Sequence, residues 1–350
     1  MKFIPSQTMK AAAVCVWLAV SGLAALASPA YSQYAGQGQD QSKDKNKQSA
    51  PSDGEQKALA KIEAAADVTA RLAAAGEFIK KYPKSTLRSK VITYVTQEVN
   101  KIQDGAQRIA QLESMQTLFK EPSDAAIIDP ILVDSYFSSN RLDDAFRVAS
   151  AHLAKNPNDV AVLTQTMIEG VEQAKKNNSK YVQQSQQYGA KAIEIIESGK
   201  KPDTFDEARW GEYKSRWLPT LYQSLGMLSI MTGNKADARA KLDKAVSLDA
   251  TEPFSYVLLG TLVNEDYQQL AQQHKTLTPG PLRDTVLKQA HAKLDEVIDL
   301  YAHAIGLAQG NATYQKLHDQ VLQDLQAYYK YRHNGSLDGL QQLIDKYKKQ

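Results

Sequence analysis

The sequence predicts an all-α protein built from antiparallel helix pairs, and three features of the chain point to this fold class. From residue 57 onward, apolar residues recur every three or four positions, which is the spacing of one face of an α-helix. Turn-forming residues interrupt this pattern about every 15 residues, so successive helices are expected to pack as antiparallel neighbours. Finally, part of the chain repeats itself, since the pattern of residues 222–226 recurs at 256–260.

Residues 1–30 have the organisation of a secretory signal peptide. Two lysines precede an apolar stretch over residues 11–27, and small residues follow it. Cleavage is expected after Ala30, with Ala27 and Ser32 as alternative sites. This prediction places the mature protein outside the cytoplasm, in the periplasm or secreted, with no membrane span after cleavage. An uncleaved membrane anchor is the alternative interpretation, although the apolar stretch is slightly short for a span of about 20 residues.

Residues 31–56 are predicted to be a disordered tether between this leader and the helical body. After Tyr34 the segment contains no large apolar side chain, so it cannot bury enough surface to offset the entropy lost on ordering. The helical body is therefore expected to begin at residue 57.

The composition of the chain excludes several classes of protein. The full chain has 42 basic and 39 acidic residues, and removing the two lysines of the leader leaves 40 against 39, a net charge of +1. Such a chain has no general attraction to nucleic acid or to anionic membranes, which favours protein partners. The single cysteine, Cys15, lies in the leader. The mature chain is therefore expected to have no disulfide, no catalytic thiol and no cysteine-ligated metal.

The first helices of the body are expected over residues 67–82, 85–102 and 106–119. Asp67 can accept hydrogen bonds from the free N–H groups at the start of the first of these helices, and Pro83 ends it. Residues 91–95 taken alone favour a β-strand, because they are rich in β-branched and aromatic side chains. The longer helical periodicity outweighs this local preference, since no partner strand or hairpin turn lies nearby.

The repeat is clearest in the second half of the chain. The segment from Tyr222 to Gly226 recurs as the segment from Tyr256 to Gly260. The glycine allows a second helix to cross closely over the first, and Leu242 of that second helix is expected to fill the gap. This pattern resembles the tetratricopeptide repeat (TPR) family, whose period of about 34 residues matches the distance between the two segments.

The resemblance implies a right-handed α-solenoid of antiparallel helix pairs. It covers residues 57–348, with clear units at 126–157 and 219–265, divergent pairs elsewhere and a C-terminal cap over 313–348. The ends of several helices are similar to those in TPR proteins of the bacterial cell envelope. End caps are needed because the terminal unit of a repeat array has no neighbour to cover it.

Two departures from the family pattern stand out. In the unit that begins at Phe254, the second helix is displaced, because the match to Leu242 is Tyr301 rather than residue 276, where the regular period would place it. Extra residues are therefore expected near 266–291, where they lengthen both helices. The second departure is His152, which stands where the family usually has alanine.

TPR arrays typically bind an extended peptide or a partner's helix along a concave face, which is lined by the first helix of each pair. The resemblance therefore implies a non-enzymatic adaptor or scaffold of the bacterial cell envelope, with a protein or peptide partner and no cofactor. The residues expected on this concave face are Asp134, Phe137, Gln223, Met227, Ile230, Met231, Val257, Thr261 and Asn264. The methionines would supply adaptable apolar contacts. Coverage of part of this face by the inserted helical residues is the alternative.

A ridge of His and Asp residues over 291–303 is the strongest candidate for catalytic chemistry. His291 and Asp295 lie on one face of the same helix and could together hold a divalent metal ion. A metal-dependent or hydrolytic enzyme acting on envelope polymers is the corresponding alternative function. However, a useful metal site needs three or four converging ligands, and one helix offers only neighbouring pairs. A solvated polar face is therefore the favoured interpretation, and no metal site is predicted.

Two aromatic clusters have both a structural and a functional interpretation. Trp210 and Trp217 share one helical face and could form a stacking platform for sugars or peptides, but packing between helices is favoured. Residues 328–333 mix tyrosines with basic side chains, which suggests either nucleic-acid stacking or helix packing. The secretory leader and the neutral charge oppose nucleic-acid binding.

The sequence contains no GxSxG elbow, no phosphate-binding GKS/T loop and no HExxH motif. We therefore predict that the protein is not an enzyme. A purely structural, self-assembling array is the third functional alternative.

Overall fold

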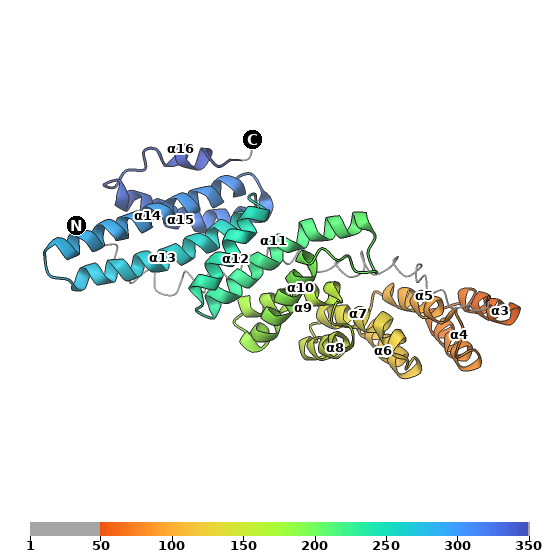
Figure 1. Cartoon of the computed structure of the whole chain (residues 1–350). Coiled ribbons are helices and arrows are strands. Elements are labelled where there is room, and N and C mark those ends of the chain that lie inside the picture. Colours follow the sequence, from red (N-terminus) through yellow and green to blue (C-terminus); the bar gives the residue numbers. More distant parts are fainter. Residues whose placement is uncertain (1–49, 349–350) are drawn as a thin grey trace. The chain divides into compact units, whose positions relative to one another are not determined.

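A computed structural model describes residues 50–348 of the chain (Figure 1). Of these residues 79% are helical, in 14 α-helices with two short 3-10 helices, and none is in a strand. The predicted all-α fold class is therefore confirmed. The predicted signal peptide over residues 1–30 and most of the predicted tether over 31–56 lie outside the described residues.

The described residues divide into two compact units. The N-terminal unit comprises residues 50–169 and 194–212, and the C-terminal unit comprises residues 170–193 and 213–348. The extent of the predicted continuous array over 57–348 stays a prediction.

In the N-terminal unit, each of the first six described helices packs against the next of the six along the chain. Its helices are α3 (Asp53–Glu63), α4 (Val68–Lys81), α5 (Arg88–Asn100), α6 (Gly105–Leu118), α7 (Pro122–Ser138) and α8 (Leu142–Lys155), followed by the first part of α9 (Val160–Lys175). In addition α5 packs against α7, so helices that are not consecutive also lie side by side.

The first helix begins earlier than the sequence composition predicts. Helix α3 starts at Asp53, inside the segment expected to be a tether. The Ser52 hydroxyl accepts a hydrogen bond from the Glu55 N–H at 3.3 Å, and the Glu55 carboxylate accepts one from the Ser52 N–H at 2.8 Å. This reciprocal capping box satisfies two N–H groups at the helix start. Leu59 and Ile62 are buried, which supplies the packing that the polar tether lacks.

The strand-prone residues 91–95 are helical. They lie within α5, where Val91, Ile92 and Val95 are all buried. Asp67 caps α4 as expected, because its carboxylate accepts a hydrogen bond from the Ala70 N–H at 2.8 Å. Burial of one continuous apolar face therefore overrides the local β-propensity of this stretch.

The C-terminal unit contains the longest helices of the described chain. It holds the end of α9, η3 (Ser179–Tyr181), most of α10 (Val182–Glu197), most of α11 (Glu207–Met231), α12 (Lys235–Leu248), α13 (Pro253–Thr276), α14 (Pro281–Ala308), η4 (Ala312–Tyr314), α15 (Gln315–Arg332) and α16 (Leu340–Asp345). Helices α13 and α14 pack along each other as a long hairpin, and α14 also packs against α15 and α16 (Figure 1). The extra residues near 266–291 are helical and lengthen both arms of this hairpin.

Two close helix crossings depend on glycine. A Cβ atom added to Gly226 of α11 would lie 2.7 Å from Cγ of Leu242 on α12. A Cβ atom added to Gly260 of α13 would lie 2.3 Å from Cε1 of Tyr301 on α14, whose side chain is 2% exposed. Neither position has room for a methyl group, so the second helix of each pair packs directly on the backbone of the first.

We expect Gly260→Ala to lower the unfolding free energy of the C-terminal unit by about 1–3 kcal/mol, the usual cost of overpacking a core. Alanine is a better helix former than glycine by about 1 kcal/mol. The expected loss of stability is therefore what remains after this gain in helix propensity has been subtracted from the steric cost. Gly76→Ala on α4 is the matched control, because no atom lies within 4 Å of the added Cβ. Urea unfolding followed by circular dichroism should show that Gly76→Ala is neutral or stabilising. If Gly260→Ala and Gly76→Ala changed the unfolding free energy equally, the close crossing at Gly260 would be contradicted.

Candidate functional site

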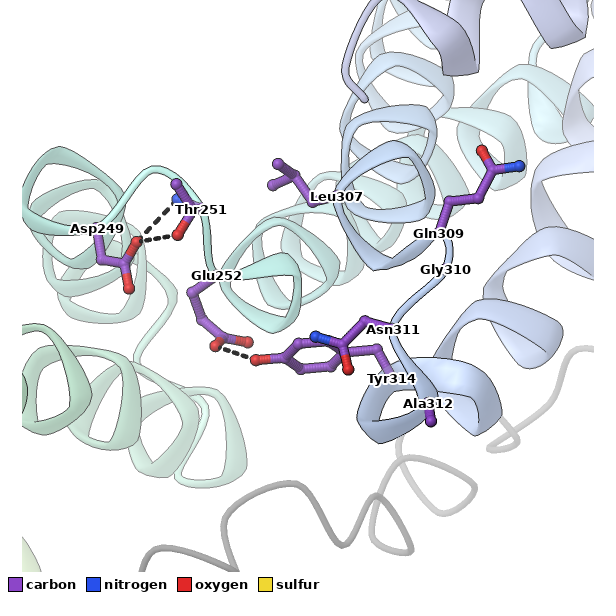
Figure 2. A pocket seen from close by; sticks show the side chains of 9 residues that line it. All are labelled: Asp249, Thr251, Glu252, Leu307, Gln309, Gly310, Asn311, Ala312 and Tyr314. Atoms are coloured by element: carbon purple, nitrogen blue, oxygen red, sulfur yellow. Dashed lines mark hydrogen bonds between the residues drawn. The ribbon is translucent and has the colours of Figure 1, made fainter. Parts of the chain in front are cut away.

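A polar cleft of about 480 Å³ opens on the C-terminal unit (Figure 2). It lies between the turn that joins α12 to α13 and the segment that joins α14 to α15. The lining residues are Asp249, Thr251, Glu252, Leu307, Gln309, Gly310, Asn311, Ala312 and Tyr314. Two turns that are distant in the sequence therefore form one site.

Hydrogen bonds hold the two acidic side chains of the cleft in fixed positions. The Tyr314 hydroxyl donates to Oε2 of Glu252 at 2.6 Å, and the Phe254 N–H donates to Oε1 of the same carboxylate at 3.0 Å (Figure 2). Oδ1 of Asp249 accepts hydrogen bonds from the N–H and the hydroxyl of Thr251, each at 2.8 Å. Glu252 therefore serves both as the N-cap of α13 and as a link to the facing turn.

The cleft has the chemistry of a site for a cationic or donor-rich group. Two carboxylates line it, and none of its nine lining residues is basic. Burial raises the pKa of the Tyr314 hydroxyl, and the hydrogen bond to Glu252 and the nearby Asp249 charge raise it further, so the phenol stays neutral. The cleft can thus accept hydrogen bonds from a bound group. This site could not be predicted from the sequence, because turn signals show where each turn lies but not which turns meet.

Most of the residues predicted to line a concave binding face are buried. Those packed in the interior are Phe137, Gln223, Met227, Val257, Thr261 and Asn264. Those only partly exposed are Asp134, Ile230 and Met231. Six of the nine side chains are therefore buried in this structure. A role in partner contact stays a prediction for all nine.

The polar members of this set connect helices to one another. Asp134 of α7 accepts a hydrogen bond from the Gln165 amide of α9 at 2.7 Å. The Gln223 amide of α11 donates to the Ser255 hydroxyl of α13 at 2.8 Å. Asn264 of α13 accepts from the Tyr328 hydroxyl of α15 at 2.9 Å. The buried side chains of Gln223 and Asn264 therefore each have a hydrogen-bond partner on a neighbouring helix, as buried polar groups usually do.

The His and Asp ridge of α14 contacts side chains later in the chain, and its two carboxylates remain exposed. Asp295 forms a bidentate ion pair with Arg332, at 2.6 and 2.8 Å. His291 lies edge-on to the ring of Tyr331, with centroids 6.2 Å apart. Among residues 50–348, no group of three His, Cys, Asp or Glu side chains is placed to hold a metal ion. The ridge therefore gives no structural support to a metal-dependent enzyme.

The remaining two residues of the ridge contact the end of the chain. Asp299 accepts a hydrogen bond from the Tyr347 hydroxyl at 2.6 Å. The His303 ring stacks between Tyr347 and Tyr256, with centroid separations of 4.1 and 3.8 Å. The two carboxylates of the ridge are exposed, and its two histidine rings contact aromatic side chains later in the chain.

The two tryptophans are core residues, not a ligand platform. Trp210 and Trp217 are each 2% exposed. Within the N-terminal unit the ring of Trp210 packs against Phe205, and within the C-terminal unit the ring of Trp217 packs against Tyr213. The favoured packing interpretation therefore agrees with their burial.

The aromatic and basic residues over 328–333 also have packing partners. The Tyr328 side chain is buried, and the Tyr329 hydroxyl donates to the carbonyl of Asp338 at 2.8 Å. The His333 ring stacks on Tyr329 at 3.9 Å, and Arg332 is paired with α14. Tyr328, Tyr329 and Arg332 therefore take part in packing within the C-terminal unit.

Comparison with known proteins gives the chain no family. No protein-family model matches it, and no curated protein matches it significantly. Within residues 50–348, the helices are too short or too polar for any of them to span a membrane.

Proposed function

We propose that the protein is a TPR-like α-solenoid that acts as a non-enzymatic adaptor of the bacterial cell envelope and binds a protein or peptide partner. The repeated glycine crossing is the observation that carries this proposal. In each crossing a glycine of one helix lies against a large side chain of the next helix. The pair is Gly226 and Leu242 at the regular repeat spacing, and Gly260 and Tyr301 across the inserted residues. We infer that the two pairs occupy equivalent positions in two consecutive repeat units.

Hydrogen bonds between alternate helices give independent support. Bonds from α7 to α9, from α11 to α13 and from α13 to α15 each connect every second helix. In a solenoid of helix pairs, every second helix belongs to the same layer, and neighbours in this layer are in contact. Repeat arrays of this kind expose extended surfaces for binding, which is why the proposal is an adaptor rather than an enzyme.

The polar cleft is the contact that we assign to the partner in this proposal. Its carboxylates are held in place before any ligand arrives, so a partner does not have to order them on binding. A lysine or arginine side chain of the partner is the group that best complements two carboxylates and a neutral phenol. The export of the adaptor is supported by the signal peptide that the sequence predicts.

Affinity capture and crosslinking from bacterial envelope extracts should test this proposal. We expect the double variant Asp249→Asn and Glu252→Gln to lose at least about tenfold in capture of a specific partner, because a charge-assisted hydrogen bond contributes about 1.5–3 kcal/mol. The matched control is the double variant Asp203→Asn and Asp284→Asn. It removes the same charge from exposed carboxylates outside the cleft. Equal capture by both double variants, or no specific partner, would contradict the proposed function.

A further inference from the structure

After α15 the described chain forms a short segment that packs against α14 (Figure 1). We call residues 336–347 the C-terminal strap. Its helix α16 spans only Leu340–Asp345, within the cap predicted over 313–348. Gly339 precedes this helix with a φ of 87°, and Asn334 and Gly335 also have positive φ. The strap is thus a separate element joined to α15 by a sharply turned link.

One face of the strap is apolar at the spacing of a docked helix. Leu340 and Ile344 are buried, and Leu343 and Tyr347 are partly buried. These positions follow the i, i+3, i+4, i+7 pattern by which an amphipathic helix binds a partner surface. The residues between them are exposed and polar, namely Gln341, Gln342, Asp345 and Lys346. The strap therefore packs against α14 through a single stripe of side chains.

The surface of α14 beneath the strap fits it closely. We call Asp299, His303 and Gly306 the docking face. A Cβ atom on Gly306 would lie 2.6 Å from the Ile344 carbonyl oxygen and 2.8 Å from Cβ of Tyr347. Asp299 accepts the Tyr347 hydroxyl, and His303 stacks on its ring. The docking face therefore offers three features to a bound segment. Gly306 lets its backbone approach closely, the His303 ring stacks on an aromatic side chain, and Asp299 accepts a hydrogen bond.

The strap is weakly held compared with the long helices that support it. Only two of its side chains are fully buried, while the whole segment must be ordered to place them. Burial of a few apolar side chains and the ordering entropy of about a dozen residues are of similar size and oppose each other. Local opening of the strap is therefore expected at a lower free energy than opening of α14.

We propose that the docking face is a binding site for an amphipathic helix of a protein partner, and that the C-terminal strap covers this site until the partner displaces it. This inference rests on the proposed adaptor function and names the kind of partner. The partner helix carries apolar residues at i, i+3, i+4 and i+7, with an aromatic donor at the last position. That residue would stack on His303 and donate to Asp299, as Tyr347 does in this structure.

A fluorescent peptide with the sequence of residues 334–350 is the probe. The full chain carrying Ile344→Asp and Tyr347→Ala should release its own strap and leave the docking face intact. We expect the peptide to bind this variant at least tenfold more tightly than it binds the unmodified chain, because the tethered strap competes at a high effective concentration. Fluorescence anisotropy measures the difference, and circular dichroism checks that helix content is kept.

Gly306→Ala is the matched control, because its added methyl group would both release the strap and obstruct the docking face. If the peptide bound Gly306→Ala as tightly as it binds the variant with Ile344→Asp and Tyr347→Ala, the proposal would be overturned. The proposal would also be overturned if the peptide bound the unmodified chain as tightly as it binds the variant with Ile344→Asp and Tyr347→Ala. The same holds if the peptide did not bind that variant although its helix content was unchanged. Concentration-dependent dimers in light scattering would assign the docking face to the strap of a second copy, which also overturns it.

Hydrogen exchange on the unmodified chain provides a measurement that needs no variant. Amides of α16 should exchange at least tenfold faster than those in the centre of α14, and equal protection would contradict an opening strap. The probe is the chain's own segment, so these outcomes do not depend on capture of an envelope partner. Peptide binding without capture would leave the docking face in place and count against the adaptor function alone.

Discussion

Replacing Arg88 by methionine should lower the unfolding free energy of the N-terminal unit by about 3–5 kcal/mol, because it leaves a buried carboxylate without its cation. Arg88 of α5 donates from Nε to Oδ1 of Asp124 at 2.8 Å and from Nη2 to Oδ2 at 2.5 Å. Asp124 of α7 is only 1% exposed. Its one other hydrogen bond within the described chain comes from the Glu121 N–H at 3.1 Å, which cannot compensate the charge.

Two further variants separate the cost of an unpaired charge from the value of the pair. The double variant Arg88→Met and Asp124→Leu should recover most of the lost stability, since a well-packed apolar pair often replaces a buried ion pair at little cost. It should fall short by about 1 kcal/mol, because Asp124 also caps the start of α7. The matched control is Arg147→Met, which breaks an exposed pair with Asp144 and should cost less than about 1 kcal/mol.

Urea unfolding monitored by circular dichroism, together with hydrogen exchange in α5 and α7, measures these differences. If Arg88→Met is as mild as Arg147→Met, the Asp124 site is better solvated than its burial implies, and the prediction is wrong. If the double variant is as unstable as the single one, packing rather than charge determines the loss.

The helices could be predicted from the sequence because their signals are local. Apolar periodicity predicted the all-α class. Asp67 could be predicted as a helix cap because it directly precedes the helix that it caps. The early start of α3 was missed although its capping residues, Ser52 and Glu55, stand in the sequence. A polar composition over the whole segment concealed this short capping motif, and the burial of Ile62 is visible only once its neighbours are placed.

The functional residues were harder to predict because their partners are distant in the chain. Gln223 and Asn264 were expected on a binding face, but each finds a hydrogen-bond partner, 32 and 64 residues away. Asp295 was considered as a metal ligand and instead pairs with Arg332, 37 residues later. Spacing along one helix identifies which side chains share a face. It does not identify which helix will cover that face.

His152 also departs from the repeat pattern, and the structure gives its substitution a physical consequence. The ring is 1% exposed, with Nε2 2.9 Å from Oδ2 of Asp159 and Nδ1 3.8 Å from Oδ2 of Asp129. Burial alone would lower the pKa of His152, but the two carboxylates outweigh it and raise the pKa to about 9. The charged imidazole therefore joins α8 to α7 and to the start of α9, where an alanine would only pack.

We expect the unfolding free energy of the N-terminal unit to fall by about 3 kcal/mol as the pH rises from about 6.5 to above 9, since each pKa unit corresponds to about 1.4 kcal/mol. The folded pKa of His152 lies above its unfolded value, so its contribution is complete below about pH 6.5 and is lost as the pH passes through about 9. Urea unfolding at several pH values measures this slope. His152→Gln is the control, because it cannot titrate. The same slope in His152→Gln would show that other groups cause it, whereas a flat profile in the variant alone would identify the buried imidazolium as the group that holds these helices together.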